Sequence, residues 1–262
     1  MANAPAFADA VKTIPELLCT GPLKPAAPGI GCHAVLIDGT PVLPATDVST
    51  LMANGSGEFR RGLGAFARAA LVRHLDSGQI AAEVEAQIRK IQAAGVQLSH
   101  LDAHKHVHLF PQVLSPLLAA AKACSVRAVR NPFAPVRPLA FAHLVRRPHL
   151  WKTYSEVKVL RYWVDEFRQT VADAGMVTTD GTFGILSTGA LDLELFQAIV
   201  GGIPEGTWEF CCHPGYNDDA LAKVRTRLRA SREREREVLT SAAAHEMLEA
   251  NEIELITYWE LQ

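Results

Sequence analysis

The sequence predicts a single α/β domain with parallel strands that spans residues 1–262. Short apolar runs alternate with longer amphipathic stretches, and this alternation is typical of strand–helix–strand units in a parallel sheet or barrel. The chain has 262 residues, 48% of them hydrophobic, and roughly 200 to 250 residues are common for one α/β barrel. A single large core is therefore expected.

The strands are expected where the apolar runs are short: Gly31–Ile37, Gln97–His104, Val126–Val129, Thr182–Leu186, Thr207–Cys212 and Glu252–Tyr258. The helices are expected where apolar residues recur every three to four positions: Val84–Ala94, Pro111–Cys124, Tyr154–Ala174, Leu191–Val200 and Ser231–Ala250. Four prolines in Pro132–Lys152 predict an irregular excursion, and such a loop often lies over the ligand end of a parallel α/β fold.

Charge and composition favour a small-molecule partner in the cytoplasm. The formal net charge is −2, with 21% charged residues, so no overall basic field would attract nucleic acid or an anionic membrane surface. The five cysteines include the adjacent pair Cys211 and Cys212, which suits a reducing compartment. The first residues lack the basic and apolar regions of an export signal, and no long apolar stretch predicts a membrane-spanning segment.

The strongest local pattern is the run from His100 to Pro111. Asp102, His104, His106 and His108 recur at every second position, so on a strand their side chains would share one face. Imidazole is a frequent metal ligand, and a neighbouring carboxylate can orient it. The pattern indicates a polar cavity with metal ligands; the alternative is a polar interior satisfied by water.

Two further histidines lie where strands end. His33 precedes the Asp38-Gly39 turn, and a lone histidine at such a position is more often structural than a ligand. His213 stands where a strand gives way to Pro-Gly, and the carboxyl end of a parallel strand is where ligands bind. Catalysis and packing remain equal alternatives for His213. The arginine- and glutamate-rich stretch Arg225–Glu237 is interpreted as a solvated, ion-paired helix.

Several motifs together resemble the YdjC-like carbohydrate deacetylases, in the order in which that family has them. They are GCHAVLIDGTPVLPA (31–45), SHLDAHKHVHLFPQV (99–113), VRAVRNP (126–132), TTDGTFGILSTGAL (178–191) and WEFCCHPGYND (208–218). The similarity is strongest to the branch associated with hopanoid biosynthesis. The resemblance covers almost the whole chain.

The resemblance implies a NodB-like, distorted (β/α) barrel with one divalent metal ion, magnesium or zinc, held by an aspartate and two histidines. By motif, the metal ligands would be His33 and His104, and His213 would be the acid that protonates the leaving amine. A homodimer is a further expectation from the family.

The remaining motif residues would support this centre. Asp102, His106 and His108 would orient His104 or contact the substrate. Arg130 would bind a substrate hydroxyl or phosphate, or form a structural salt bridge.

The start of the chain departs from the family pattern. An Asn/Ala-Asp-Asp-Phe-Gly strand, which supplies the third ligand and the general base, has no counterpart here, and the early acids Asp9 and Glu16 lie outside the motif. We therefore expect a barrel that lacks its first strand. A start assigned at an internal Met is favoured over a genuine truncation, because loss of that strand would expose the edges of its neighbours.

The expected activity is metal-dependent removal of an N-acetyl group from an amino sugar, in an oligosaccharide or a hopanoid-linked glycolipid. With His33 and His104 alone, metal binding should be weak, since catalytic sites usually have three protein ligands. One alternative is an inactive sugar- or glycolipid-binding homologue. Another is a different metal-dependent hydrolase, such as a phosphoesterase.

Overall fold

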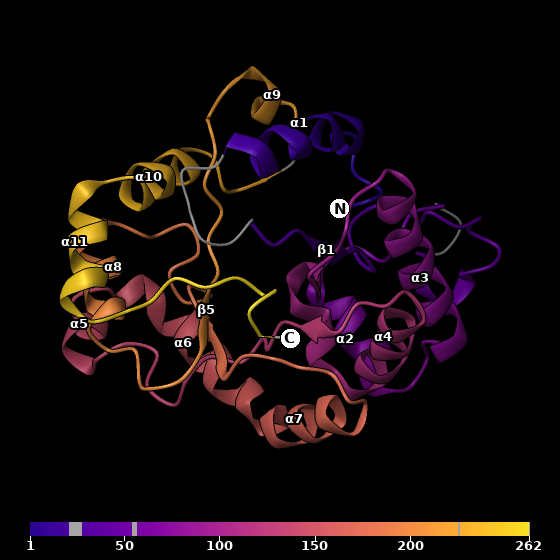
Figure 1. The fold of residues 1–262 in the computed structure, drawn as a ribbon. Helices are drawn as coiled ribbons and strands as arrows, with labels where there is room; N and C mark the ends of the chain where they lie inside the picture. Colours follow the sequence, from indigo (N-terminus) through magenta and orange to yellow (C-terminus); the bar gives the residue numbers. More distant parts are fainter. Residues whose placement is uncertain (21–27, 54–56, 225, 262) are drawn as a thin grey trace. The chain divides into compact units, whose positions relative to one another are not determined.

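The computed structural model describes residues 1–20, 28–53, 57–224 and 226–261, and it is a mixed α/β protein with parallel sheets (Figure 1). The contacts group the chain into two compact units. Unit 1 comprises Met1–Pro132, Trp163–Thr178 and Ile256–Gln262, and unit 2 comprises Phe133–Tyr162 and Thr179–Leu255. The parallel α/β class is confirmed, whereas the closed barrel and the single domain over residues 1–262 stay predictions.

Unit 1 contains a three-stranded parallel sheet in the order β1-β2-β3. Its strands are β1 (Gly31–Ala34), β2 (His100–Ala103) and β3 (Ala128–Val129). Its helices are α1 (Phe7–Thr20), η1 (Ser49–Leu51), α2 (Leu63–Leu71), α3 (Ser77–Ala93), η2 (His104–Leu109), α4 (Pro111–Ala123) and α7 (Val164–Asp173). In Figure 1, α2, α3 and α4 lie around β1.

Helix α3 shows how local sequence builds this unit. The side chain of Asp76 accepts a hydrogen bond from Gln79 N at 2.8 Å and so caps the first turn. Ile80, Val84 and Ile88 recur at i, i+4 and i+8 and are fully buried, which is the stripe of an amphipathic helix packed on a core.

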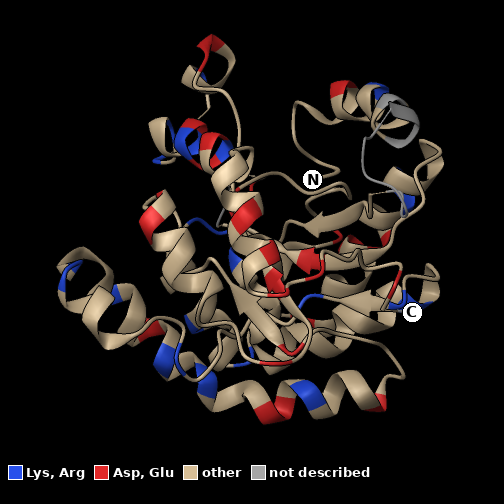
Figure 2. Ribbon diagram, turned by 60° about the vertical axis from the view of Figure 1, so that its left-hand side comes forward, with Lys and Arg blue, Asp and Glu red and all other residues tan. Residues whose placement is uncertain are grey.

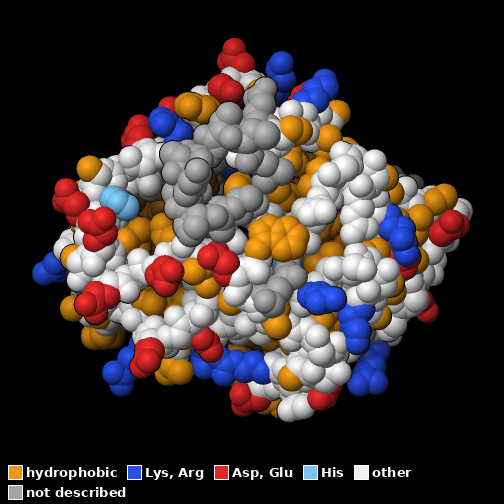
Figure 3. Space-filling view, viewed as in Figure 1, with side chains coloured by type: hydrophobic (Ala, Val, Ile, Leu, Met, Phe, Trp, Pro, Cys, Tyr) orange, Lys and Arg blue, Asp and Glu red, His pale blue; other side chains and the backbone are white. Residues whose placement is uncertain are grey.

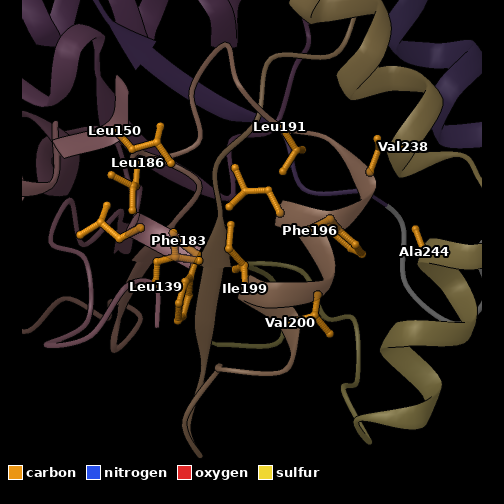
Figure 4. Close-up of a cluster of buried hydrophobic side chains, with 12 residues drawn as sticks. Leu139, Leu150, Phe183, Leu186, Leu191, Phe196, Ile199, Val200, Val238 and Ala244 are labelled. Carbon is orange, nitrogen blue, oxygen red and sulfur yellow. The ribbon is translucent and has the colours of Figure 1, made fainter. Parts of the chain in front are cut away.

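Unit 2 contains the parallel pair β4 (Gly181–Phe183) and β5 (Trp208–Phe210). Its other elements are α5 (Phe141–Val145), η3 (Pro148–Leu150), α6 (Trp151–Leu160), α8 (Leu193–Val200), α9 (Asp219–Ala222), α10 (Ala230–Leu239) and α11 (Ala242–Ala250). The hydrophobic core of this unit gathers side chains from β4, α8, α10 and α11, with Leu139 and Leu150 from the proline-rich segment (Figure 4).

Five of the six predicted strands form, each shorter than predicted. The sixth, Glu252–Tyr258, is wrong: Glu252 has a left-handed φ of 54°, and residues 253–257 form no ladder with another described strand. The predicted helix 154–174 is broken by η4 (Arg161–Trp163). The predicted helix 231–250 is broken at Ser241, whose hydroxyl accepts a hydrogen bond from Ala244 N and starts α11.

The excursion predicted for Pro132–Lys152 contains α5 and η3, and α6 begins at its end. Its position over a ligand site stays a prediction. None of the helices in the described residues has the length and hydrophobicity needed to cross a bilayer. On the face seen in Figure 3, hydrophobic side chains lie between charged ones, as is usual on protein surfaces.

Gly184, at the carboxyl end of β4, is required by its surroundings. Its φ is 91°, and a Cβ there would lie 1.9 Å from the carbonyl oxygen of Cys211. We expect Gly184→Ala to lower the free energy of unfolding by at least about 3 kcal/mol, because backbone strain and a steric clash add. Urea denaturation measures the loss. Gly64→Ala is the control, because no atom lies within 4 Å of its Cβ; equal losses in both variants would contradict this account.

Candidate functional site

The carboxyl ends of the three strands of unit 1 bring the predicted site residues together. His33 on β1 and Asp102 on β2 are Cα partners in the parallel register, so their side chains lie on the same face of the sheet. Arg130 follows β3 directly, and its N–H donates to Leu101 O at 3.0 Å. Sheet register therefore places three polar side chains from distant parts of the sequence side by side.

Asp102 is the centre of this group. One of its oxygens, Oδ2, accepts hydrogen bonds from His33 Nδ1 at 2.7 Å and from the Arg130 guanidinium. The side chain of Asp102 is only 5% exposed. Burial opposes ionisation, but His33 and Arg130 outweigh it and hold the pKa of Asp102 well below its usual value. Asp102 is therefore a buried carboxylate that fixes both neighbours.

His33 and His104 face each other through ring nitrogens. The distance from His33 Nε2 to His104 Nδ1 is 3.3 Å, and the rings meet edge to face at 79°. His33 Nδ1 donates its hydrogen bond to Asp102, so the other ring nitrogen, Nε2, is the one that faces His104. Burial, together with His33 and Lys105, lowers the pKa of His104 to about 4. His33 Nε2 and His104 Nδ1 are therefore neighbours at the ends of β1 and β2.

These two nitrogens fit two positions of a metal centre. Metal–nitrogen bonds of about 2.0–2.1 Å at a tetrahedral angle imply ligand nitrogens about 3.3 Å apart, and the separation here is 3.3 Å. A carboxylate behind one ligating histidine is also usual in metal sites. Among the described residues, however, no three His, Cys, Asp or Glu side chains are grouped for a metal ion. The described residues therefore bring two imidazole nitrogens to a spacing that two metal ligands could have.

The prediction that Asp102, His104, His106 and His108 share one strand face is wrong. Strand β2 ends at Ala103, and η2 follows from His104 to Leu109. Within η2, Lys105 and His106 have positive φ values of 54° and 55°, a conformation that ends the alternation of a strand. Only Asp102 and His104 of the four therefore belong to the group around His33.

His108 has a structural position instead. It is fully buried and its Nε2 donates to Arg130 O at 3.1 Å, so it supports the backbone of the residue that contacts Asp102. Its ring lies 6.3 Å from that of His106, centroid to centroid. Burial and the nearby His106 lower the pKa of His108 to about 3. His108 is thus neutral in the folded protein.

Acid should destabilise the fold through His108. The unfolded chain protonates this histidine near pH 6.5, whereas the folded chain does so only near pH 3, so stability falls as pH falls through this window. Between pH 7 and pH 5, His108 should account for about 2 kcal/mol of lost stability. In urea denaturation at both pH values, His108→Gln should reduce the loss by that amount. His245→Gln, at a site 72% exposed, should leave the loss unchanged; no difference between the two variants would contradict the assignment.

Two further groups were not predicted from the sequence. Glu83 is fully buried on α3 and accepts hydrogen bonds from the N–H groups of Val42 and Leu43, at 2.8 and 3.0 Å. Gln87, one turn later, bonds both backbone groups of Val35. Together they hold the chain as it leaves β1. A glutamate and a glutamine four residues apart on an otherwise apolar helix face are the sequence signal that was available.

Asp38 and Lys105 form an ion pair beside His104. Burial opposes ionisation of Asp38, but Lys105 and the N–H of Gly62 lower its pKa. The pair joins the turn after β1 to the left-handed residue of η2. It therefore helps to hold His104 in place.

His213 lies in unit 2, after the carboxyl end of β5. Its backbone N–H donates to Glu235 Oε2 at 2.5 Å, and Gly189 N lies 3.4 Å from Oε1 of the same carboxylate. Glu235 is 2% exposed, so the prediction of a solvated helix is wrong at this position. The arginine-rich pattern around Glu235 concealed a buried anchor of the loop that carries His213. The catalytic role of His213 stays a prediction.

Comparison with known proteins gives consistent matches. The YdjC-like protein family matches residues 1–250. A carbohydrate deacetylase from Thermoanaerobacter pseudethanolicus is 26% identical over 88% of this chain and 76% of its own length. One from Geobacillus stearothermophilus is 28% identical over 99% and 84%.

The human carbohydrate deacetylase is 29% identical over 71% of this chain and 58% of its own length. Among solved structures, a protein from Enterococcus faecalis titled "putative cellobiose-phosphate cleavage protein" matches with a TM-score of 0.75 and 21% identity. That match covers all of this chain and 85% of the other, and it supports the α/β fold.

Proposed function

Because this chain belongs to the YdjC-like family, we propose that it is a carbohydrate N-deacetylase, a hydrolase that releases acetate from an N-acetylated amino sugar. The observation that carries the proposal is the group of His33, His104 and Asp102 at the ends of the parallel strands. The names of the relatives, all carbohydrate deacetylases, support the same activity.

In this proposal His33 and His104 hold one divalent metal ion. Imidazole ligands favour zinc over magnesium, which prefers oxygen. Bound there, the metal would supply the Lewis acidity that polarises an acetyl carbonyl and activates water. Asp102 keeps the His33 tautomer that directs a lone pair into the site, and Arg130 keeps Asp102 ionised.

The proton for the departing amine is assigned to His213, which stands at the carboxyl end of β5. Its backbone N–H donates to the buried Glu235. This hydrogen bond would restrict the motion of the loop that carries the imidazole. A general acid must be held within reach of the atom it protonates. His213→Gln should therefore lower kcat, with metal binding unchanged.

An inactive sugar- or glycolipid-binding role is the second candidate. It is favoured by the finding that the described residues group fewer than three metal-binding side chains. Catalytic zinc sites commonly use three protein ligands. The two candidate functions differ in whether bound sugar is hydrolysed, so acetate release and sugar binding together distinguish them.

Acetate release tests the proposal. This chain is incubated with N-acetylglucosamine oligomers and with an N-acetylglucosamine glycolipid of the hopanoid type, in zinc, in magnesium and in EDTA. We expect metal-dependent acetate release, with the glycolipid preferred if the hopanoid branch is correct. Binding of these sugars without acetate release in every condition would favour the inactive homologue. A chain that neither binds these sugars nor releases acetate from them would exclude both candidate functions.

A further inference from the structure

The proline-rich segment of unit 2 and helix α6 expose several large apolar side chains, most of them aromatic. Phe141 and Val145 on α5 are 69% and 52% exposed, and Trp151 and Val159 on α6 are 47% and 71% exposed. Tyr162, just after α6, is 84% exposed. These five residues form what we call the α5–α6 surface. Several large apolar side chains exposed within one short segment usually mark an interaction site.

The α5–α6 surface has a fixed structure. The rings of Phe141 and Trp151 meet edge to face with centroids 6.4 Å apart, and Trp151 Nε1 donates to Leu144 O at 3.0 Å. Leu144 of α5 and Leu150 of η3 are buried in the core of unit 2. The segment is therefore anchored in the core while it exposes aromatic side chains to solvent.

The charge of this segment differs from that of the whole chain. Residues 133–162 contain six lysines and arginines against one acid, Glu156, although the chain has a net charge of −2. Figure 2 shows both signs of charge distributed over the ribbon as a whole. Arg147 is neutralised by Asp192 and Glu194. The exposed cations of this segment are Arg137, Arg146, Lys152 and Lys158. Lys152 lies 3.9 Å from Glu156 in an exposed pair, so the segment keeps a net positive charge.

We propose that the α5–α6 surface binds the surface of an anionic lipid bilayer. Trp, Tyr and Phe favour the membrane–water interface, and exposed lysines and arginines around them are attracted to anionic headgroups. A second copy of the chain is a poorer occupant, because a two-fold contact would place like charges against each other. Helices α5 and α6 have five and ten residues, so the proposed contact is with the headgroup region of one leaflet. The net charge of the whole chain is negative, but headgroup attraction falls off within a Debye length, so the local positive charge of the segment decides the contact.

Co-sedimentation with vesicles tests the proposal on the full chain. We expect at least tenfold tighter binding to phosphatidylcholine vesicles that contain one third phosphatidylglycerol than to pure phosphatidylcholine. High salt should weaken the binding. Phe141→Ser should reduce it about tenfold, and the double variant Arg146→Glu/Lys152→Glu should do the same without removing apolar area.

Leu255→Ser is the matched control. Leu255 is 69% exposed like Phe141, but its neighbours in the sequence include the acids Glu252 and Glu254 instead of exposed cations. It should leave binding within twofold of the parent. Far-ultraviolet circular dichroism verifies that each variant is folded. Equal binding to both vesicle types, or binding untouched by Phe141→Ser and by the charge reversals, would overturn the proposal. The proposal would also be overturned if the chain bound no vesicles and formed a dimer that these substitutions dissociate.

Discussion

Replacing His33 by alanine is expected to lower acetate release about 10³-fold or more. The substitution removes one of the two facing imidazole nitrogens, which are 3.3 Å apart. It also leaves Asp102 without one of its two partners. A bound metal contributes several kcal/mol to the transition state, and about 1.4 kcal/mol corresponds to each factor of ten in rate. Steady-state acetate release and zinc titration by calorimetry measure the two effects, and His104→Ala should match His33→Ala in both.

The control for these variants is His245→Ala. His245 lies on α11, is 72% exposed and pairs only with Glu249 at 3.2 Å, so its loss should leave both acetate release and zinc affinity unchanged. If His33→Ala retains the zinc affinity and the rate of the parent chain, the assignment of this pair as metal ligands is wrong.

The second large effect is expected for Asp102→Asn. The amide keeps the shape of the side chain but not its charge, so Arg130, whose side chain is 13% exposed, loses its buried counter-ion. Removing one partner of a buried ion pair costs roughly 3–5 kcal/mol of stability. The His33 ring also loses the charged acceptor that fixes its tautomer, because the amide offers one neutral oxygen and an NH₂ group, and such a loss lowers metal affinity roughly 10–100-fold. Thermal unfolding and zinc titration report the two consequences separately.

A double variant separates stability from metal binding. Adding Arg130→Met to Asp102→Asn removes the guanidinium that had the Asp102 carboxylate as its counter-ion, so part of the lost stability should return. The zinc affinity should stay low, because His33 still lacks its carboxylate. A double variant that regains both properties would mean that Asp102 acts only as the partner of Arg130.

The sequence predicted which residues lie together better than it predicted their local geometry. His33, His104 and Arg130 are predicted at strand ends and Asp102 within a strand, and the structure brings them together through the register of β1, β2 and β3. The register itself was not predictable, because it depends on pairing between strands about 70 residues apart. Alternation alone also failed to show that the chain turns at Lys105 and His106.

The sequence analysis also did not predict the buried carboxylates that hold backbone N–H groups. Glu235 lies in a run of arginines that predicts a solvated helix, yet it is 2% exposed and holds the N–H of His213. Glu83 likewise holds the N–H groups of Val42 and Leu43. Their partners are backbone groups distant in sequence, which carry no residue-type signal. Such anchors become visible only when the tertiary structure supplies both ends of the bond.

Zinc K-edge X-ray absorption on the metal-loaded protein is the most direct test of the proposed centre. We expect two imidazole nitrogens at about 2.0–2.1 Å from zinc, and a spectrum with one imidazole fewer in His33→Ala and in His104→Ala. A zinc ion bound without imidazole, or a spectrum unchanged in both variants, would contradict a metal centre built on His33 and His104.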